Sequence, residues 1–201
     1  MTLNALVLVC TLKKSPEESS SELLGNQILA ELATNGVHGE SLRLVDFDVK
    51  FGVTTDEGDG DQWPVIRAKI VAADILVIAA PTWVGQLSSP GVQLLERLDA
   101  ELGETDSLGR PSMYDKVAVV GVVGNEDGAH HVSSQLFQGL CDLGFTISSQ
   151  ASTYWNDVAM GSTDYKDLPE TPEKVASATK ALAANAAHLA NLLKATPYPA
   201  G

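Results

Sequence analysis

Three short stretches of the chain gather residues that could do chemistry, and each directly follows a predicted strand. The first stretch, residues 11–21, carries five hydroxyl side chains and a lysine pair where an amphipathic helix begins. Its candidate binding residues are Thr11, Lys13, Ser15, Ser19, Ser20 and Ser21. The free N–H groups and positive dipole end of a helix N-terminus form an anion site. A Ser19-x-x-Glu22 cap on a surface loop needs one hydroxyl, so five of them favour phosphate binding.

The second stretch follows the unbroken apolar run 75–80 and consists of Pro81, Thr82, Trp83, Val84, Gly85 and Gln86. These residue types suit a flat aromatic ligand. The tryptophan offers a stacking face, the threonine and glutamine can reach polar ring edges, and the glycine permits close backbone approach. The alternative is an ordinary strand-to-helix turn whose tryptophan packs into the rim.

The third stretch follows the predicted strand 116–123 and includes Gly124, Asn125, Glu126, Asp127, Gly128, His130 and His131. Adjacent histidines point in different directions on a helix, and no third ligand stands at a useful spacing, so we expect no metal. We expect one histidine to pack and the other to face the pocket, where the helix dipole disfavours its protonated form. His130 is the candidate for contact with a substrate.

Five strands and five helices position these stretches. Continuous apolar runs at 5–9 and 75–80 and the largely apolar segment 116–123 predict buried parallel strands. Weaker strands are expected at 41–47 and at 144–154, where the last segment could also be a strand pair. Helices are expected at 20–33, 62–73, 92–102 and 129–143, with a last one to residue 194 that starts from an N-cap at Thr171 with Pro172 at its first position. Ligands of open α/β sheets bind at the carboxyl ends of the strands, so the three stretches should converge there.

Composition narrows the class of protein. With 201 residues and 44% hydrophobic content, one domain spanning 1–201 is expected, with 195–201 as a flexible tail. The net charge of −13 argues against nucleic acid and anionic membranes as partners. No run approaches the roughly 18 apolar residues of a membrane span, and the N-terminus lacks signal-peptide features, so we expect a cytoplasmic protein. Cys10 and Cys141 are expected to be inert buried thiols.

Several familiar sites can be excluded on spacing. No glycine precedes Leu24, so the sequence has no P-loop after its first strand. A low-molecular-weight tyrosine phosphatase needs a cysteine followed, after five residues, by an arginine, but the sixth residue after Cys10 is Pro16. The acidic segment 54–61 lacks calcium-loop spacing, since position 12 counted from Asp56 is Arg67. We therefore expect that segment to be a solvated loop.

In their order and spacing, the three stretches resemble the flavodoxin-like superfamily, and within it the NAD(P)H-dependent FMN reductase and WrbA-like quinone reductase branch. The resemblance covers nearly the whole chain and implies a three-layer α/β/α fold with a five-stranded parallel sheet of order 2-1-3-4-5. It implies non-covalent FMN, with the phosphate at the first stretch and the isoalloxazine at the second and third. The chain differs from the pattern in its longer first loop, which carries Glu17 and Glu18, and in Trp83, where tyrosine is common.

The resemblance implies an oxidoreductase that takes hydride from NAD(P)H and passes electrons to a quinone, a flavin or a similar small acceptor. Backbone amides of Val84, Gly85 and Gln86 would then stabilise the reduced ring. The alternatives are a flavodoxin-type electron carrier, which the acidic charge suits, and a flavin-free regulatory domain.

The connection 155–168 carries Trp155, Met160 and Tyr165 in a segment without periodicity. Large side chains of this kind are enriched in interfaces, and related reductases commonly build their sites from several subunits. We therefore expect a homodimer or a higher homo-oligomer. The alternative is that this connection forms a lid over the chain's own ligand.

Overall fold

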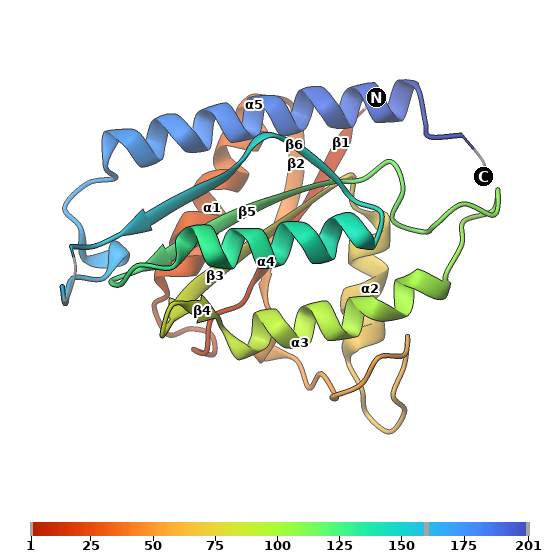
Figure 1. Cartoon of the computed structure of the whole chain (residues 1–201), viewed down its shortest axis with the longest axis horizontal. Helices are drawn as coiled ribbons and strands as arrows, with labels where there is room; N and C mark the ends of the chain where they lie inside the picture. The colour runs from red at the N-terminus through yellow and green to blue at the C-terminus, as the bar shows by residue number, and fades with distance from the viewer. Residues whose placement is uncertain (1, 159–160, 200–201) are drawn as a thin grey trace.

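The computed structural model describes residues 2–158 and 161–199. Five parallel strands form the central sheet: β1 (Leu3–Val9), β2 (Val37–Arg43), β3 (Ile75–Trp83), β5 (Val117–Gly124) and β6 (Thr146–Asn156). Their order, β2-β1-β3-β5-β6, confirms the predicted order once the parallel strands alone are counted. A short additional strand, β4 (Gln86–Leu87), pairs antiparallel with the end of β3 (Figure 1).

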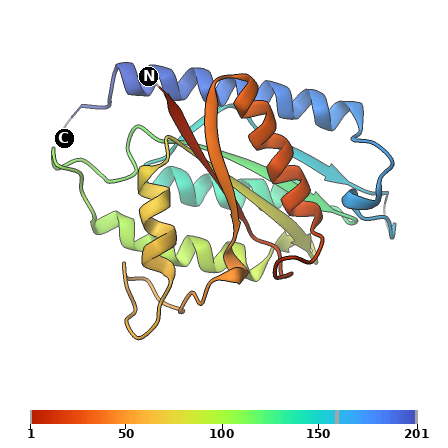
Figure 2. The same ribbon diagram turned by 180° about the vertical axis from the view of Figure 1, so that it is seen from behind.

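Five α-helices cover the sheet: α1 (Ser20–Thr34), α2 (Trp63–Ala72), α3 (Ser89–Leu98), α4 (Ala129–Asp142) and α5 (Glu173–Ala195). Helices α1 and α5 pack on one face of the sheet, whereas α2, α3 and α4 pack on the other. The opposite views in Figures 1 and 2 show these two layers. The fold is therefore the predicted flavodoxin-like α/β/α arrangement. Along the described chain, no helix is both long enough and apolar enough to cross a membrane.

The central strand β3 is buried on both faces, which explains its unbroken apolar run. Ile75, Val77 and Ala79 contribute to the core beneath α1 and α5, and Leu76 and Ile78 contribute to the core beneath α2, α3 and α4. A strand covered by helices on both sides needs apolar residues at every position.

The strand predicted at 41–47 exists but its bounds were wrong, because β2 covers Val37–Arg43 and a 3-10 turn, Leu44–Asp46, follows it. β2 lies at the edge of the sheet, and most of its side chains between Val37 and Arg43 are at least partly exposed. An edge strand of this kind lacks the apolar pattern that identifies the buried strands.

Two helix boundaries also differ from the prediction. α3 begins after Ser88, earlier than residue 92, and a 3-10 turn, Asp99–Gly103, replaces its last predicted turn. The predicted side-chain cap at Thr171 does not form: Pro172 is the cap residue of α5, and the Thr171 hydroxyl accepts a hydrogen bond of 2.8 Å from Gln27.

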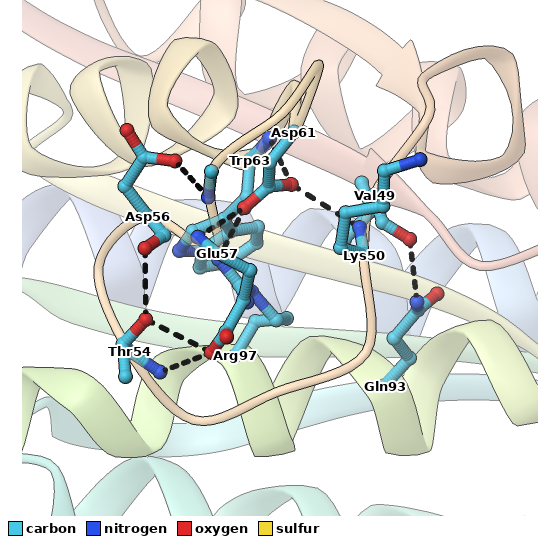
Figure 3. Close-up of polar contacts among 10 residues, drawn as sticks. Val49, Lys50, Thr54, Asp56, Glu57, Asp61, Trp63, Gln93 and Arg97 are labelled. Carbon is cyan, nitrogen blue, oxygen red and sulfur yellow. Dashed lines mark hydrogen bonds and ion pairs between the residues drawn. The ribbon is translucent and has the colours of Figure 1, made fainter.

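The acidic loop after β2 is more ordered than a solvated loop, as Figure 3 shows. The Asp61 carboxylate is buried and pairs at 2.7 Å with the buried guanidinium of Arg97, which also pairs with Glu57 at 3.2 Å. Asp61 accepts backbone N–H bonds from Lys50 and Trp63 as well. The loop is therefore fastened to α3 by ionic and hydrogen bonds.

The two cysteines differ in environment. Cys10 is fully buried, and burial raises the pKa of its thiol to about 12, in agreement with an inert residue. Cys141 is exposed on α4, contrary to the prediction that both thiols are buried, because it lies on the solvent side of an amphipathic helix whose inward positions are Leu136 and Leu140.

The C-terminal tail, which we expected to be flexible, contacts the body of the protein at Tyr198. The Tyr198 N–H donates to the Asp115 carboxylate at 2.8 Å, and its carbonyl accepts from Arg110 at 2.8 Å. Its ring lies 5.4 Å from that of Tyr114.

Candidate functional site

The three predicted stretches meet around a cavity of about 170 Å³ at the carboxyl ends of the strands. Its wall consists of the loop after β1 and the start of α1, the ends of β3, β5 and β6, and a segment that follows β6. The lining residues are Thr11, Leu12, Lys13, Ser19, Ser20, Ser21, Pro81, Thr82, Trp83, Val123, Gly124, Asn125, Trp155, Asp164 and Tyr165. The convergence predicted from strand order is therefore observed.

The N-terminus of α1 forms one end of this cavity. Ser19 is the N-cap, and its hydroxyl accepts the N–H of Glu22 at 3.4 Å, which is half of a capping box. The first N–H groups of a helix have no partner within the helix, so those of Ser20 and Ser21 are available to a ligand. The Ser21 side chain is buried against the cavity. Amide and hydroxyl donors therefore converge where the helix dipole is positive.

A buried arginine on β2 holds the loop that precedes α1. The Arg43 guanidinium donates to the Glu22 carboxylate at 2.9 and 2.6 Å, and to the Lys13 carbonyl at 3.0 Å. The hydrogen bond with Glu22 raises the pKa of Arg43 further above its usual value. Because Glu22 bonds Arg43, it does not return to the Ser19 N–H, and the second half of the capping box is absent.

Ser15 holds the same loop from outside the cavity and does not line it. Its N–H and hydroxyl donate to the Asp46 carboxylate at 2.9 and 2.6 Å. Burial alone raises the pKa of Asp46, but the two hydrogen bonds from Ser15 and the charge of Arg43 outweigh that effect and leave the pKa below its ordinary value. The structure thus places Ser15 as a support of the loop and not at the predicted ligand position.

The two glutamates of the long first loop pair with lysines and do not line the cavity. Glu17 is exposed and lies 3.8 Å from the Lys13 ammonium, and Glu18 is exposed and lies 3.9 Å from that of Lys166. Neither carboxylate lines the cavity, so the local charge that a phosphate would meet is lower than the sequence of the loop suggests.

The second stretch is a tight hairpin. β3 continues through Pro81 to Trp83 and pairs with β4 across a two-residue turn, in which Val84 and Gly85 have φ angles of 52° and 70°. Two positive φ values define the turn type that matches hairpin twist, but a β-branched residue there is strained. Such strain is stored where the surrounding structure holds it, often at functional sites.

Residues of the third stretch hold this hairpin by hydrogen bonds and close packing. The Glu126 carboxylate accepts the Val84 N–H at 2.6 Å, and His131 hydrogen-bonds the Gln86 side chain at 2.9 Å. Gly128, with φ 141°, lies so close that a Cβ there would stand 2.8 Å from the Gly85 Cα.

These contacts divide the predicted site residues into two groups. Of the second and third stretches, the residues that line the cavity are Pro81, Thr82, Trp83, Gly124 and Asn125. The residues that do not line it are Val84, Gly85, Gln86, Glu126, Asp127, Gly128 and His131. Asp127 accepts the N–H of Gly128 at 2.7 Å, and His130 pairs with the Tyr154 hydroxyl at 3.1 Å outside the cavity wall.

Thr82 provides a test of whether the cavity fits a polar ring. Its hydroxyl is buried, and within the described part of the chain it has no hydrogen-bond partner. A buried polar atom without a partner costs free energy, so a ligand atom that satisfies it is favoured. Trp83, 51% exposed, adds an aromatic face at the same wall. The residues present therefore fit a flavin ring at this end and a phosphate at α1.

Leu12, Val123 and Asp164 line the cavity without having been predicted, and Trp155 and Tyr165, which were expected in a subunit contact or a lid, line it as well. Trp155 lies at the end of β6, which extends to Asn156, whereas Asp164 and Tyr165 follow that strand. Only 2% of Tyr165 is exposed, its ring lies 5.6 Å from that of Trp155, and its hydroxyl donates to Gln27 on α1 at 2.7 Å. This part of the connection thus covers the chain's own cavity, as the lid alternative describes, while Met160 lies outside the described residues.

Comparison with known proteins identifies the class. The model of the NADPH-dependent FMN reductase family matches residues 3–157, and the chain belongs to this family of flavin oxidoreductases, which use FMN and NAD(P)H. A curated relative, the 8-demethyl-8-aminoriboflavin-5'-phosphate synthase of Streptomyces davaonensis, is 32% identical over 211 residues, which cover 98% of this chain and 81% of the relative.

Two solved structures illustrate the range of similarity. The crystal structure of RosB with the bound intermediate 8-demethyl-8-formylriboflavin-5'-phosphate has a TM-score of 0.87 and 30% identity, and the match covers 98% of this chain and 82% of that one. A flavodoxin from the domain Archaea has a TM-score of 0.60 at 10% identity, covering 94% of this chain and 99% of that one, and shows the fold alone.

Proposed function

We propose that this protein binds FMN in the cavity, takes hydride from NAD(P)H and passes the electrons to a quinone, a flavin or a similar small acceptor. The observation that carries the proposal is the placement of two complementary ends in one cavity. One end holds the amide and hydroxyl donors of α1, and the other holds the Trp83 face and the unpartnered Thr82 hydroxyl.

Bound FMN supplies the electron-accepting centre, so the protein contributes binding, orientation and electrostatics. Ser19, Ser20, Ser21, Thr11 and Lys13 hold the phosphate by charge-assisted hydrogen bonds and charge. This local set of donors is needed because the protein as a whole carries a charge of −13.

The hairpin holds in place the residues that face the flavin ring. Thr82 and Trp83 lie on its first strand, Glu126 holds its turn at Val84, and His131 holds its second strand at Gln86. We propose that the nicotinamide and the acceptor approach over the side bordered by Trp83 and Asn125. Glu126 and His130 act there through neighbouring groups, since one bonds Val84 and the other bonds Tyr154.

The direct test is the colour of the purified protein, followed by NAD(P)H oxidation with and without a quinone. The proposal predicts a protein that binds FMN and oxidises NAD(P)H faster when the quinone is added. A flavin-loaded protein that is reduced only by another protein would be an electron carrier, and a protein that binds no FMN would contradict the proposal.

One observation favours a second function, chemistry on the flavin itself. The relative that matches 98% of this chain is named for making 8-demethyl-8-aminoriboflavin-5'-phosphate, and the RosB structure holds the 8-formyl compound. Mass spectrometry of FMN incubated with the protein separates the two functions: an unchanged mass after many turnovers supports electron transfer, and a changed mass supports flavin modification.

We also propose a homodimer or a higher homo-oligomer. Trp83, which lines the cavity, and its neighbour Val84 are both exposed, and a partner would cover this apolar surface. Tyr165, one of the residues on which the expected interface was based, is buried within the chain and is not available to a partner. Light scattering at micromolar concentration with FMN present tests this, and a monomeric mass would leave only the lid role for the connection 155–168.

A further inference from the structure

A carboxylate lines a cavity that is otherwise built to receive an anion. Asp164 lies in the connection after β6, at the start of the 3-10 turn Tyr165–Asp167, and it forms part of the wall together with Lys13 and the α1 serines. A negative charge near a phosphate is unfavourable unless it serves another part of the ligand.

The ordinary explanation for an aspartate at this position does not hold. Asp at the start of a helical turn usually accepts a backbone N–H of that turn. Asp164 makes no such side-chain cap bond. Across the described residues, its one side-chain hydrogen bond comes from the Asn125 amide, at the limiting distance of 3.5 Å. A carboxylate can accept about four hydrogen bonds, so most of the acceptor capacity of this cavity-lining residue is unused by the described part of the protein.

The neighbours of Asp164 locate it between the two ends of the site. On one side, the N–H of Lys166, two residues on, donates to the Ser20 hydroxyl at the phosphate end, at 3.2 Å. On the other side, Asn125 belongs to the stretch that borders the ring end. FMN joins its phosphate to its ring by a chain of hydroxyl groups, and these hydroxyls must pass between the two ends.

We propose that Asp164 is a specificity-determining residue that accepts hydrogen bonds from the ribityl hydroxyls of the flavin. The inference rests on the proposed FMN site and adds the part of the ligand that this residue recognises. Asp164 selects flavins that carry the hydroxylated chain, and it does so at the cost of some repulsion of the phosphate.

This assignment predicts effects of different size on different flavins. Removing the carboxylate removes the acceptor for the hydroxyls, which weakens binding of riboflavin. It also removes a negative charge near the phosphate, which strengthens binding of FMN relative to riboflavin. Lumiflavin has neither the chain nor the phosphate, so its binding should not change.

The experiment measures the affinities of FMN, riboflavin and lumiflavin for the flavin-free protein by fluorescence quenching. The variants are Asp164→Ala and Asp164→Asn. Asp167→Asn is the control, because it removes a charge from the same turn at an exposed side chain that pairs with Lys166 outside the cavity.

For Asp164→Ala we expect the affinity for riboflavin to fall at least about tenfold. The affinity for lumiflavin should stay within twofold, and the affinity for FMN should fall less than that for riboflavin. Asp164→Asn retains one acceptor oxygen, so riboflavin should lose less than it does in the alanine variant. Asp167→Asn should leave riboflavin unchanged.

Equal losses for riboflavin and lumiflavin would overturn the assignment, because they would mean that Asp164 only supports Asn125 or the ring end. Unchanged riboflavin affinity in Asp164→Ala would overturn it as well, while normal FMN binding by the unmodified protein would leave the proposed function intact. An unmodified protein that binds none of the three flavins would contradict both.

Discussion

Two loops of this protein are each held by a buried arginine, and they differ in whether polar groups near the loop remain available to a ligand. Arg97 on α3 holds the acidic loop through Asp61 and Glu57, and it lies 5.5 Å from the Trp63 ring (Figure 3). Arg43 on β2 holds the loop before α1. Both guanidinium groups are almost completely buried.

In the first loop, charged groups pair with one another. The Asp61 carboxylate accepts hydrogen bonds from Arg97 and from backbone N–H groups, and neither Asp61 nor Arg97 lines the candidate cavity. In the second, Arg43 is occupied by Glu22 and the Lys13 carbonyl, which leaves the helix N–H groups facing the cavity. The more strongly charged loop is therefore the structural one, and the binding site lies where polar groups remain free beside a cavity.

The largest expected effect is on the structural loop. Arg97→Met leaves Asp61 buried without its counter-ion, which costs about 3–5 kcal/mol in the free energy of unfolding. Urea denaturation measures this loss, and FMN affinity should be unchanged under conditions where the variant is folded. The control Lys69→Met breaks the exposed pair with Glu40 and should cost less than about 1 kcal/mol. Similar losses in the two variants would contradict the comparison.

The next effect is on the binding loop. Replacing Ser19 and Ser21 by Ala together should weaken FMN by on the order of 10²-fold, because each charge-assisted hydrogen bond contributes about 1.5–3 kcal/mol. Loss of the Ser19 cap should lower stability by about 1 kcal/mol. Riboflavin, which lacks the phosphate, should bind almost as before. Calorimetric titration with unchanged FMN affinity would refute the phosphate assignment.

Arg43→Met tests whether the second arginine serves the site. Releasing the Lys13 carbonyl and leaving Glu22 unpaired should weaken FMN about tenfold, an amount that matches the loss of one hydrogen bond. Riboflavin affinity should change by less than twofold. If the affinities for FMN and riboflavin fall equally, Arg43 supports only the fold, and both arginines then have the same structural role.

The smallest effect concerns His130, which lies at the rim and bonds Tyr154. We expect His130→Ala to slow turnover while FMN stays bound. Because the imidazole does not line the cavity, the loss should be below the roughly 10²-fold that removal of a general acid or base costs. Steady-state kinetics and the retained flavin absorbance measure both quantities. A variant that loses its flavin would make His130 a cofactor anchor.

The sequence predicted the central strands and the meeting of the three stretches well, for a physical reason. Strands buried on both faces, such as β3 and β5, must be apolar at each position, and their carboxyl ends lie at one edge by topology. The edge strand β2 was misplaced because its exposed residues carry no such pattern.

The hairpin was missed because its turn residues give no local signal. Val84 is a poor residue for a position with positive φ, and the usual Asn-Gly or Asp-Gly pair is absent. The division between residues that line the cavity and residues that clasp the hairpin, such as Glu126 and His131, depends on side-chain directions that spacing does not reveal.

Asp164 was not identified because it contributes to the site from a connection without periodicity. Its role depends on where the 3-10 turn at Tyr165 packs against α1, through the contacts to Gln27 and Ser20. Contacts of such long sequence separation cannot be derived from a pattern of neighbouring residues.

A crystal structure of the protein with FMN would locate both ends of the flavin in the cavity. We expect the phosphate against the N–H groups of Ser20 and Ser21, and the isoalloxazine beside Trp83 with a polar ring atom on the Thr82 hydroxyl. A phosphate bound away from the N-terminus of α1, or a ring placed outside the wall formed by Trp83 and Thr82, would contradict this expectation.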